Sequence, residues 1–170
     1  PGAPKTYSKA ADAALPRTAP RKGVEASAAG RKAISEEIRQ RPPHLDVRPA
    51  LDALRQRGTR VAALTNSTKK VATAQLQSAG LSKLFEKILS VDEVKRYKPA
   101  RDAYEYAARE LGVETGDVLL VAAHAWDVPG AMAAGCKAAF VARPGKSLNP
   151  LGKKPDFVVK DLDELVRKMK

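Results

Sequence analysis

The feature that most constrains the fold is a short, unbroken apolar run that ends in a polar turn. Residues 118–123 read Val-Leu-Leu-Val-Ala-Ala, and His124, Ala125, Trp126 and Asp127 follow directly. An apolar run without polar alternation is typical of a strand buried on both faces of a parallel sheet. Polar groups directly after such a strand lie at the carboxyl edge of the sheet, where α/β proteins bind their ligands. We therefore expect a buried strand here, with Asp127 at a candidate site.

Strand-like and helix-like patterns alternate along most of the chain. Further strands are expected at 60–64, 84–89, 138–141 and 157–159, and helices at 48–58, 68–80, 103–111, 127–135 and 162–169. Ser67 or Thr68, Asp102 and Asp161 are the expected N-caps of three of these helices. Alternation of this kind predicts βαβ units, and hence an α/β fold with a mainly parallel, Rossmann-like sheet and flanking helices.

The first 43 residues differ from the rest. Residues 1–23 are basic and rich in proline, without an apolar period, which predicts an extended arm. The remnant of an organelle targeting sequence and an arm that wraps a partner are the alternatives. Residues 24–40 read as an alanine-rich helix that Pro42 and Pro43 end. We divide the chain into this arm with one helix, 1–43, and an α/β core, 44–170.

The chain is strongly basic, with a formal net charge of +12. Such a charge favours an anionic partner, which could be nucleic acid, an acidic membrane surface or an acidic protein. Because Lys and Arg are spread along the whole sequence, a solvated basic surface explains the composition equally well.

Cysteine content and hydropathy limit the compartment. The single cysteine, Cys136, cannot form an internal disulfide, and we expect it to be a buried small side chain. No apolar run approaches bilayer length, so no transmembrane segment is expected. We expect the cytoplasm or an organelle matrix rather than secretion. No Cys/His set has metal-ligand spacing, and we expect neither a metal nor a cofactor.

Three polar sets follow predicted strands. They are Thr65 with Asn66, Lys98, and His124 with Asp127. In a parallel sheet they converge at one edge, where a hydroxyl, an amide, an ammonium and a carboxylate suit the capture of a small anionic substrate. Each has an ordinary structural explanation when taken alone, namely a turn, a solvated lysine and a helix N-cap.

These residues also occur in three ordered motifs. The motifs are Leu64-Thr65-Asn66-Ser67, Lys95-Arg96-Tyr97-Lys98-Pro99, and residues 121–127 followed by Gly130-Ala131. Together they resemble the haloacid dehalogenase superfamily, and within it the L-2-haloacid dehalogenase branch, over residues 44–170. The resemblance implies the Rossmann-like core of that superfamily and a lineage of hydrolases that cleave 2-haloacids or phosphoryl groups.

The resemblance also assigns roles to individual residues. Lys98 would hold the charge of the nucleophile and the substrate, and Asp127 would help to place the attacking water without a metal. Both are our candidate catalytic residues. The candidate substrate-binding residues are Thr65, Asn66, Tyr104 and His124.

The first motif of the superfamily has no counterpart in this sequence. That motif is a strand ending in the nucleophilic Asp, and no early acid here follows a strand-like run. In the superfamily this strand lies between those expected at 60–64 and 118–123. Each buried backbone group left unpaired costs on the order of 1–3 kcal/mol, out of a total stability of roughly 5–15 kcal/mol. Either the two strands pair directly, or another chain supplies the strand, or the sequence is incomplete.

Two functional interpretations follow. The first is a haloacid dehalogenase-like hydrolase core that is inactive as this chain because the nucleophile is absent. The second is a non-catalytic basic subunit of a large assembly, such as an organellar ribosome, that binds RNA or an acidic protein.

Overall fold

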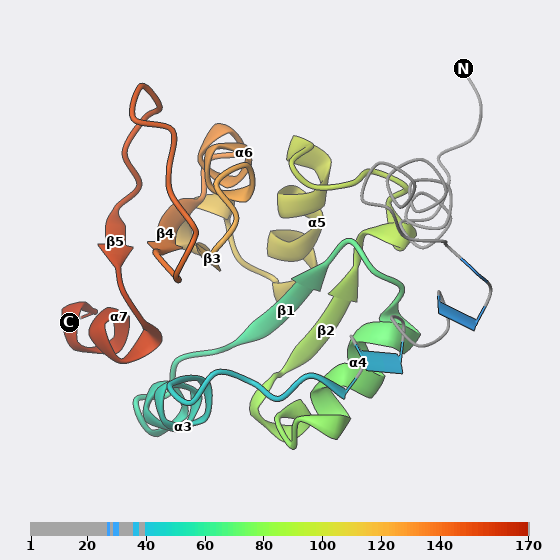
Figure 1. Ribbon diagram of the computed structural model, residues 1–170. Coiled ribbons are helices and arrows are strands. Elements are labelled where there is room, and N and C mark those ends of the chain that lie inside the picture. The colour runs from blue at the N-terminus through green and yellow to red at the C-terminus, as the bar shows by residue number, and fades with distance from the viewer. Residues whose placement is uncertain (1–26, 28, 31–35, 38–39, 170) are drawn as a thin grey trace.

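The computed structural model describes residues 27, 29–30, 36–37 and 40–169 (Figure 1). The predicted arm and most of the helix expected at 24–40 lie outside the described residues. The division between residues 43 and 44 therefore stays a prediction.

The described chain contains strands that pair only in parallel. They are β1 (Ala62–Thr65), β2 (Lys87–Ser90), β3 (Leu119–Ala122), β4 (Lys137–Val141) and β5 (Phe157–Val159). β1 pairs with β2, and β4 lies between β3 and β5, all in parallel register. The predicted α/β fold with parallel strands is confirmed.

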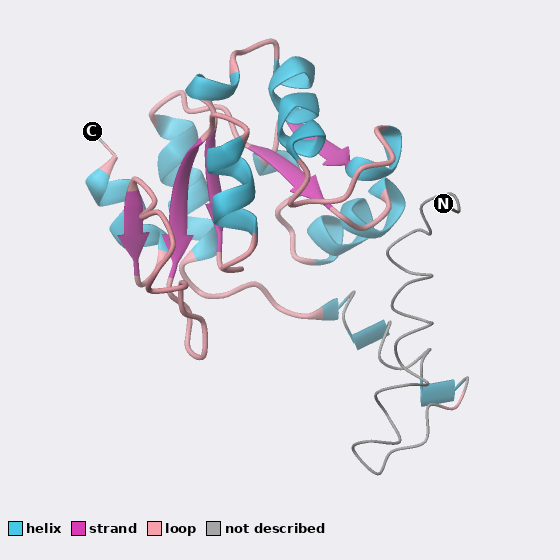
Figure 2. Ribbon diagram, turned by 90° about the horizontal axis from the view of Figure 1, so that it is seen from above, coloured by secondary structure: helices cyan, strands magenta, loops and turns pink. Residues whose placement is uncertain are grey.

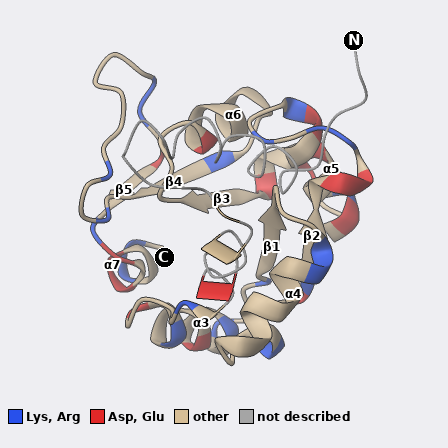
Figure 3. Cartoon of the chain, turned by 45° about the vertical axis from the view of Figure 1, so that its right-hand side comes forward, with Lys and Arg blue, Asp and Glu red and all other residues tan. Residues whose placement is uncertain are grey.

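Helices cover both faces of these strands. They are α3 (Val47–Gln56), α4 (Lys69–Ser78), α5 (Arg101–Leu111), α6 (Asp127–Ala133) and α7 (Leu162–Lys168), with short 3₁₀ turns at Ser82–Leu84, Val91–Glu93 and Thr115–Asp117. Figure 3 shows α3, α4 and α7 on one side of the strands and α5 and α6 on the other. This is a three-layer α/β/α arrangement.

Among the described residues, β1 and β3 do not pair with each other, although they are the inner strands of the two sheets (Figure 2). Direct pairing of these two strands, the first of the three alternatives given above, is therefore wrong. A cavity of about 830 Å³ lies between them and is lined by residues 61–64 and 118–123. Residues of α3, α5 and α7 line the rest of this cavity.

This cavity changes the environment of β3. We expected the run at 118–123 to be buried on both faces, but most of it is only half-buried, and Val121 is 41% exposed. Full burial belongs instead to β4, where Ala138, Ala139 and Phe140 are covered. The expectation was wrong because it placed neighbours on both sides of β3, whereas in the described part of the chain β3 pairs with β4 alone.

Two of the three expected N-caps are present. The Thr68 hydroxyl accepts from the amide of Val71, and the Asp161 carboxylate accepts from the amide of Glu164. Asp102 is not a cap, because α5 begins at Arg101, two residues before the expected start, and its N-cap is Ala100. The carboxylate of Asp102 instead lies in the first turn, where its negative charge interacts favourably with the positive end of the helix dipole.

Other expectations from composition can be compared with the described residues. Cys136 is a buried free thiol, and burial raises its pKa. In the part of the chain that the structure describes, no helix has the length and apolar character needed to cross a bilayer.

Candidate active site

The centre of the candidate site is a buried ion pair between Lys98 and Asp127. The Lys98 Nζ lies 2.6 Å from Asp127 Oδ2, and the two side chains are 10% and 4% exposed. Lys98 comes from the loop before α5, and Asp127 is the first residue of α6. The N-cap of α6 is Trp126, and no side chain caps this helix. The capping explanation for Asp127 is therefore wrong, and its carboxylate faces Lys98 instead.

Tyr104 binds the other oxygen of the same carboxylate. Its hydroxyl donates to Asp127 Oδ1 at 2.6 Å, and it comes from the first turn of α5. Burial, followed by the hydrogen bond and the negative charge of Asp127, raises the pKa of Tyr104 well above its usual range. Tyr104 therefore stays protonated and remains a hydrogen-bond donor to Asp127.

Asn66 fixes the position of the lysine through the backbone. Its Oδ1 accepts from the amide of Lys98 at 2.9 Å, and its Nδ2 donates to the carbonyl of Lys98 at 3.2 Å. The peptide bond from Lys98 to Pro99 is cis. Because both polar atoms of Asn66 are bound to the Lys98 backbone, Asn66 is placed as a positioning residue for this loop.

Thr65 ends β1 next to Asn66. Its Oγ1 accepts from the amide of Ser67 at 2.9 Å, so the hydroxyl hydrogen is not used in this bond. Thr65 is half-buried and remains able to donate to an anion at the carboxyl edge.

His124 lies apart from the buried pair. It is exposed, and its ring centroid lies 5.5 Å from that of Trp126 in a tilted arrangement. Trp126, which is 44% exposed, connects it to the site, because the Lys98 Nζ lies 6.0 Å from the Trp126 ring centroid. The structure thus brings together Lys98, Asp127 and Tyr104 and leaves His124 at the surface.

Two residues that support the site were not predicted to do so. A Cβ on Gly130 would lie 2.5 Å from Pro99 Cβ and 2.7 Å from the Tyr104 hydroxyl, so only glycine lets α6 approach the Lys98 loop. Ser90 is 1% exposed and donates to the carbonyl of Ser67 at 2.8 Å, which ties the end of β2 to the turn after β1. The position of Gly130 shortly after Asp127 could have indicated its role in the site. Nothing in the sequence around Ser90 indicated a role for that residue.

The cavity between β1 and β3 reaches this site. Lys98 and Tyr104 line it. Among the described residues that line it, the only carboxylate is Asp117, which precedes β3 and so lies at the opposite end from Lys98. No described acid of the lining is therefore placed beside Lys98 as a nucleophile.

Asp46, which directly precedes α3, is bound by residues outside the candidate site. Its Oδ2 lies 2.7 Å from Arg143 Nη2 and accepts from the amide of Leu162 at 2.7 Å. Burial favours the protonated form, but the hydrogen bonds from Arg143 and Leu162 outweigh it and lower the pKa of Asp46. Asp46 therefore joins α3, α7 and the loop after β4, a structural role.

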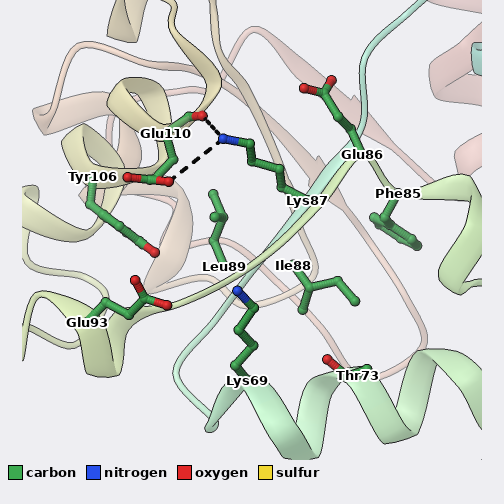
Figure 4. Close-up of a pocket in the computed structure, with 10 residues that line it drawn as sticks. All are labelled: Lys69, Thr73, Phe85, Glu86, Lys87, Ile88, Leu89, Glu93, Tyr106 and Glu110. Atoms are coloured by element: carbon green, nitrogen blue, oxygen red, sulfur yellow. Dashed lines mark hydrogen bonds and ion pairs between the residues drawn. The ribbon is translucent and has the colours of Figure 1, made fainter.

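A second cavity, of about 440 Å³, lies at the outer edge of β2 between α4 and α5 (Figure 4). Lys87 lines this cavity, and its ammonium group is bound by the carbonyl and the carboxylate of Glu110. Tyr106 faces Glu93, and burial together with that carboxylate raises the pKa of Tyr106 to about 12. None of the predicted site residues lines this cavity, so the candidate site is the one at Lys98. In the described part of the chain no three potential metal ligands cluster.

Comparison with known proteins gives a consistent family. Residues 2–135 match the family model of haloacid dehalogenase-like hydrolases. Haloacetate dehalogenase H-2 of Moraxella sp. (strain B) is 37% identical over 133 residues, which are 78% of this chain and 59% of that protein. The (S)-2-haloacid dehalogenase of Pseudomonas sp. (strain YL) is 31% identical over 160 residues, which are 94% of this chain and 69% of that protein.

Solved structures agree. The L-2-haloacid dehalogenase RSc1362 has a TM-score of 0.90 at 27% identity, covering 96% of this chain and 72% of that one. The enzyme from Xanthobacter autotrophicus, solved with chloropropionic acid covalently bound, has a TM-score of 0.85 at 26% identity, covering 96% of this chain and 75% of that one. The chain spans 59% to 69% of the length of the curated relatives given above. It belongs to the haloacid dehalogenase-like hydrolase family.

Proposed function

We propose that this chain carries the charge-balancing and anion-binding part of a 2-haloacid dehalogenase and is inactive without an added carboxylate. The observation that carries the proposal is the buried Lys98–Asp127 pair, 2.6 Å apart. Lys98 also lines one end of the cavity, and Asp117, the only described carboxylate of the cavity lining, lies at the other end. The names of the relatives, which are dehalogenases of haloacetate and (S)-2-haloacids, supply the substrate class.

The reaction would proceed in two displacements. A carboxylate attacks C2 of the 2-haloacid, forms a C–O bond and expels the halide with the electron pair of the carbon–halogen bond. Water then attacks the resulting ester at its carbonyl carbon, which releases a 2-hydroxy acid and restores the carboxylate. Both steps gather negative charge close to one point, and a preorganised ammonium there lowers the barrier.

Lys98 suits that task, because its position is fixed from several directions. Asn66 holds its backbone and Asp127 holds its ammonium group. Of the three donors of the ammonium, Asp127 uses one, so others can serve the substrate carboxylate or the nucleophile. The hydroxyl of Thr65 can provide a further donor at the same edge.

Asp127 suits the hydrolytic step. Its two oxygens accept from Lys98 and Tyr104, and a carboxylate has about four acceptor sites. The remaining acceptor sites can receive a proton of water and orient it. Trp126 packs next to the ammonium and provides an apolar surface for the carbon chain of a small haloacid.

Binding and turnover test the proposal separately. Titration of the purified chain with 2-chloropropionate, followed by NMR or calorimetry, should show saturable binding that Lys98→Met abolishes. Lys153→Met, on an exposed loop residue, is the matched control and should bind as the parent does. Halide release should be absent from the chain alone. Sustained halide release that survives Lys98→Met, or binding that survives it, would contradict the proposal.

A role as a basic subunit of a large assembly is the second candidate, and the net charge of +12 favours it. Both basic and acidic residues occur in α3, α5 and α7, whereas the charged residues of α4, Lys69 and Lys70, are both basic (Figure 3). Binding to a labelled structured RNA at low and high salt is the test. A steep loss of affinity with salt supports this role, whereas absent or salt-insensitive binding excludes RNA as the partner.

A further inference from the structure

The outer edge of β2 has no strand partner in the described part of the chain, where β2 pairs with β1 alone. When a strand pairs on one side only, alternate backbone N–H and C=O groups point away from its partner. The second cavity, of about 440 Å³, is lined by residues 85–89 and so includes this edge. Lys69 and Thr73 enter it from α4, and Tyr106 and Glu110 enter it from α5 (Figure 4). The free edge therefore lies in a cavity with one helix on each side.

The dimensions of this cavity suit a short extended peptide. Its volume falls within the range of roughly 300–1,000 Å³ that is typical of ligand cavities. β2 provides four residues, Lys87–Ser90, which correspond to about 13 Å of extended chain. The apolar side chains of Phe85, Ile88 and Leu89 also line the cavity. A peptide that pairs with β2 thus covers apolar surface as well as the backbone edge.

The wall on the α4 side offers positive charge and a hydroxyl. In Figure 4 no dashed line reaches Lys69, so its ammonium binds none of the other residues drawn. Lys69 is the first residue of α4, where the positive end of the helix dipole adds to its charge. Thr73, one turn further along, lines the same wall. An ammonium beside a hydroxyl suits a carboxylate, so this wall recognises an acidic side chain.

The wall on the α5 side is negative. The ammonium of Lys87 is bound by the carbonyl of Glu110 and lies 3.8 Å from the carboxylate of the same residue. The carboxylate of Glu93 stands on this side as well (Figure 4), which gives two carboxylates to one ammonium. Glu86 also lines the cavity, but two hydrogen bonds of 2.7 Å from Arg60 hold its carboxylate. The excess negative charge on the α5 side suits a basic side chain.

The two walls together define which sequence fits. Successive side chains of a strand point to opposite faces, so neighbouring residues of a peptide paired with β2 meet opposite walls. An acidic residue directly beside a basic one satisfies both walls at once. The same two residues separated by one position point to a single wall, where one of them meets its own charge.

We propose that the outer edge of β2 is a docking site for an extended segment of a partner protein in which an acidic and a basic residue are neighbours. The backbone of the segment pairs with β2, its acidic side chain binds Lys69 and Thr73, and its basic side chain binds Glu93 and Glu110. None of the residues of the candidate active site lines this cavity. The docking site is therefore independent of the proposed function.

The test uses the full chain and two fluorescein-labelled peptides of identical composition. Thr-Val-Glu-Lys-Val-Thr has its charges on opposite faces of a strand, and Thr-Glu-Val-Lys-Val-Thr has them on the same face. We expect saturable binding of the first by fluorescence anisotropy, and binding of the second at least about tenfold weaker. N-methylation of the first peptide at the Glu amide or at the Lys amide tests the backbone pairing. Since neighbouring amides of a strand point to opposite sides, only one of these two modifications should weaken binding.

Lys69 and Lys70 provide a matched pair of variants. Lys69→Met removes the ammonium that lines the cavity and should weaken binding of the first peptide about tenfold. Lys70→Met removes the same charge from the next residue, which is also exposed but does not line the cavity, and should bind as the parent does. The thermal midpoints of both variants confirm that they are folded.

Each other result overturns the proposal. Absence of binding, or equal binding of the two peptides, excludes recognition by the two walls. Equal effects of the two N-methylations exclude pairing with β2, and equal effects of Lys69→Met and Lys70→Met reduce the interaction to net charge. A dimer seen by light scattering that Lys69→Met dissociates and the peptide does not would assign the edge to a second copy. Binding of 2-chloropropionate reports on Lys98 alone and should be the same with and without the peptide.

Discussion

Asn66 holds the backbone of Lys98 at two points, accepting from its amide at 2.9 Å and donating to its carbonyl at 3.2 Å. The side chain that follows β1 thereby sets the position of a lysine that follows β2. The ammonium of this lysine in turn meets the carboxylate that begins α6. Asn66 is thus a link between the two separate sheets at their carboxyl edge.

Replacing Asn66 by alanine should release this loop. The Lys98 amide and carbonyl lose their partners, which costs on the order of 1–3 kcal/mol of unfolding free energy. The binding of 2-chloropropionate should weaken as well, because the ammonium is no longer held in place. Denaturant unfolding and ligand titration measure the two effects. Asn149→Ala, in an exposed turn where the amide of Leu151 is the partner, is the control that should leave ligand binding unchanged.

Removing one member of the buried ion pair should cost more than removing both. Asp127→Leu leaves the Lys98 ammonium buried without a counter-charge, and such changes cost roughly 3–5 kcal/mol. The double variant Lys98→Met/Asp127→Leu should recover much of that loss, because no charge remains to be desolvated. A double-mutant cycle by urea unfolding gives the coupling. Additive losses would show that the two side chains do not interact in solution.

Gly130→Ala should disturb the contact between α6 and the loop that carries Lys98. The new methyl group would meet Pro99 and the Tyr104 hydroxyl at under 3 Å, and overpacking of this kind costs typically about 1–3 kcal/mol. We expect a lower thermal midpoint and weaker haloacid binding. Gly116→Ala is the matched control, since nothing lies within 4 Å of the added carbon. A Gly130→Ala variant as stable as the parent would show that α6 and the Lys98 loop are not in close contact.

Asp46 should make the domain sensitive to acid. Its pKa is lowered from an ordinary value of 3.8, so the folded state binds its proton less readily than the unfolded state does. The stabilisation is present above pH 3.8 and is lost as the pH falls through the lower, folded-state pKa. Asp46→Asn should lower stability at neutral pH and flatten its fall in acid, measured by urea unfolding across the pH range. Asp52→Asn, in an exposed ion pair with Arg48, should change neither.

The sequence predicted the elements of the core well, because local signals specify them. Thr68 and Asp161 each stand where a strand or turn passes into an apolar period, and both are caps. Asp102 gives the same local signal, but α5 begins two residues before the expected start.

The candidate site was likewise predicted only in part. The convergence of Lys98 and Asp127 follows from parallel topology, and the alternation of strands and helices was enough to predict it. That Asn66 binds backbone atoms and that His124 turns to Trp126 depend on side-chain directions within loops. The half-burial of β3 escaped prediction for another reason: hydrophobicity reports what a strand is suited to meet, not whether a neighbour is present.

Arg57, at the end of α3, donates to the carbonyls of Val166 and Met169 at the end of α7. The first helix of the core is thus hydrogen-bonded directly to the last one, with no strand between them. The spacing between the two sheets is consequently a property of the helical layer.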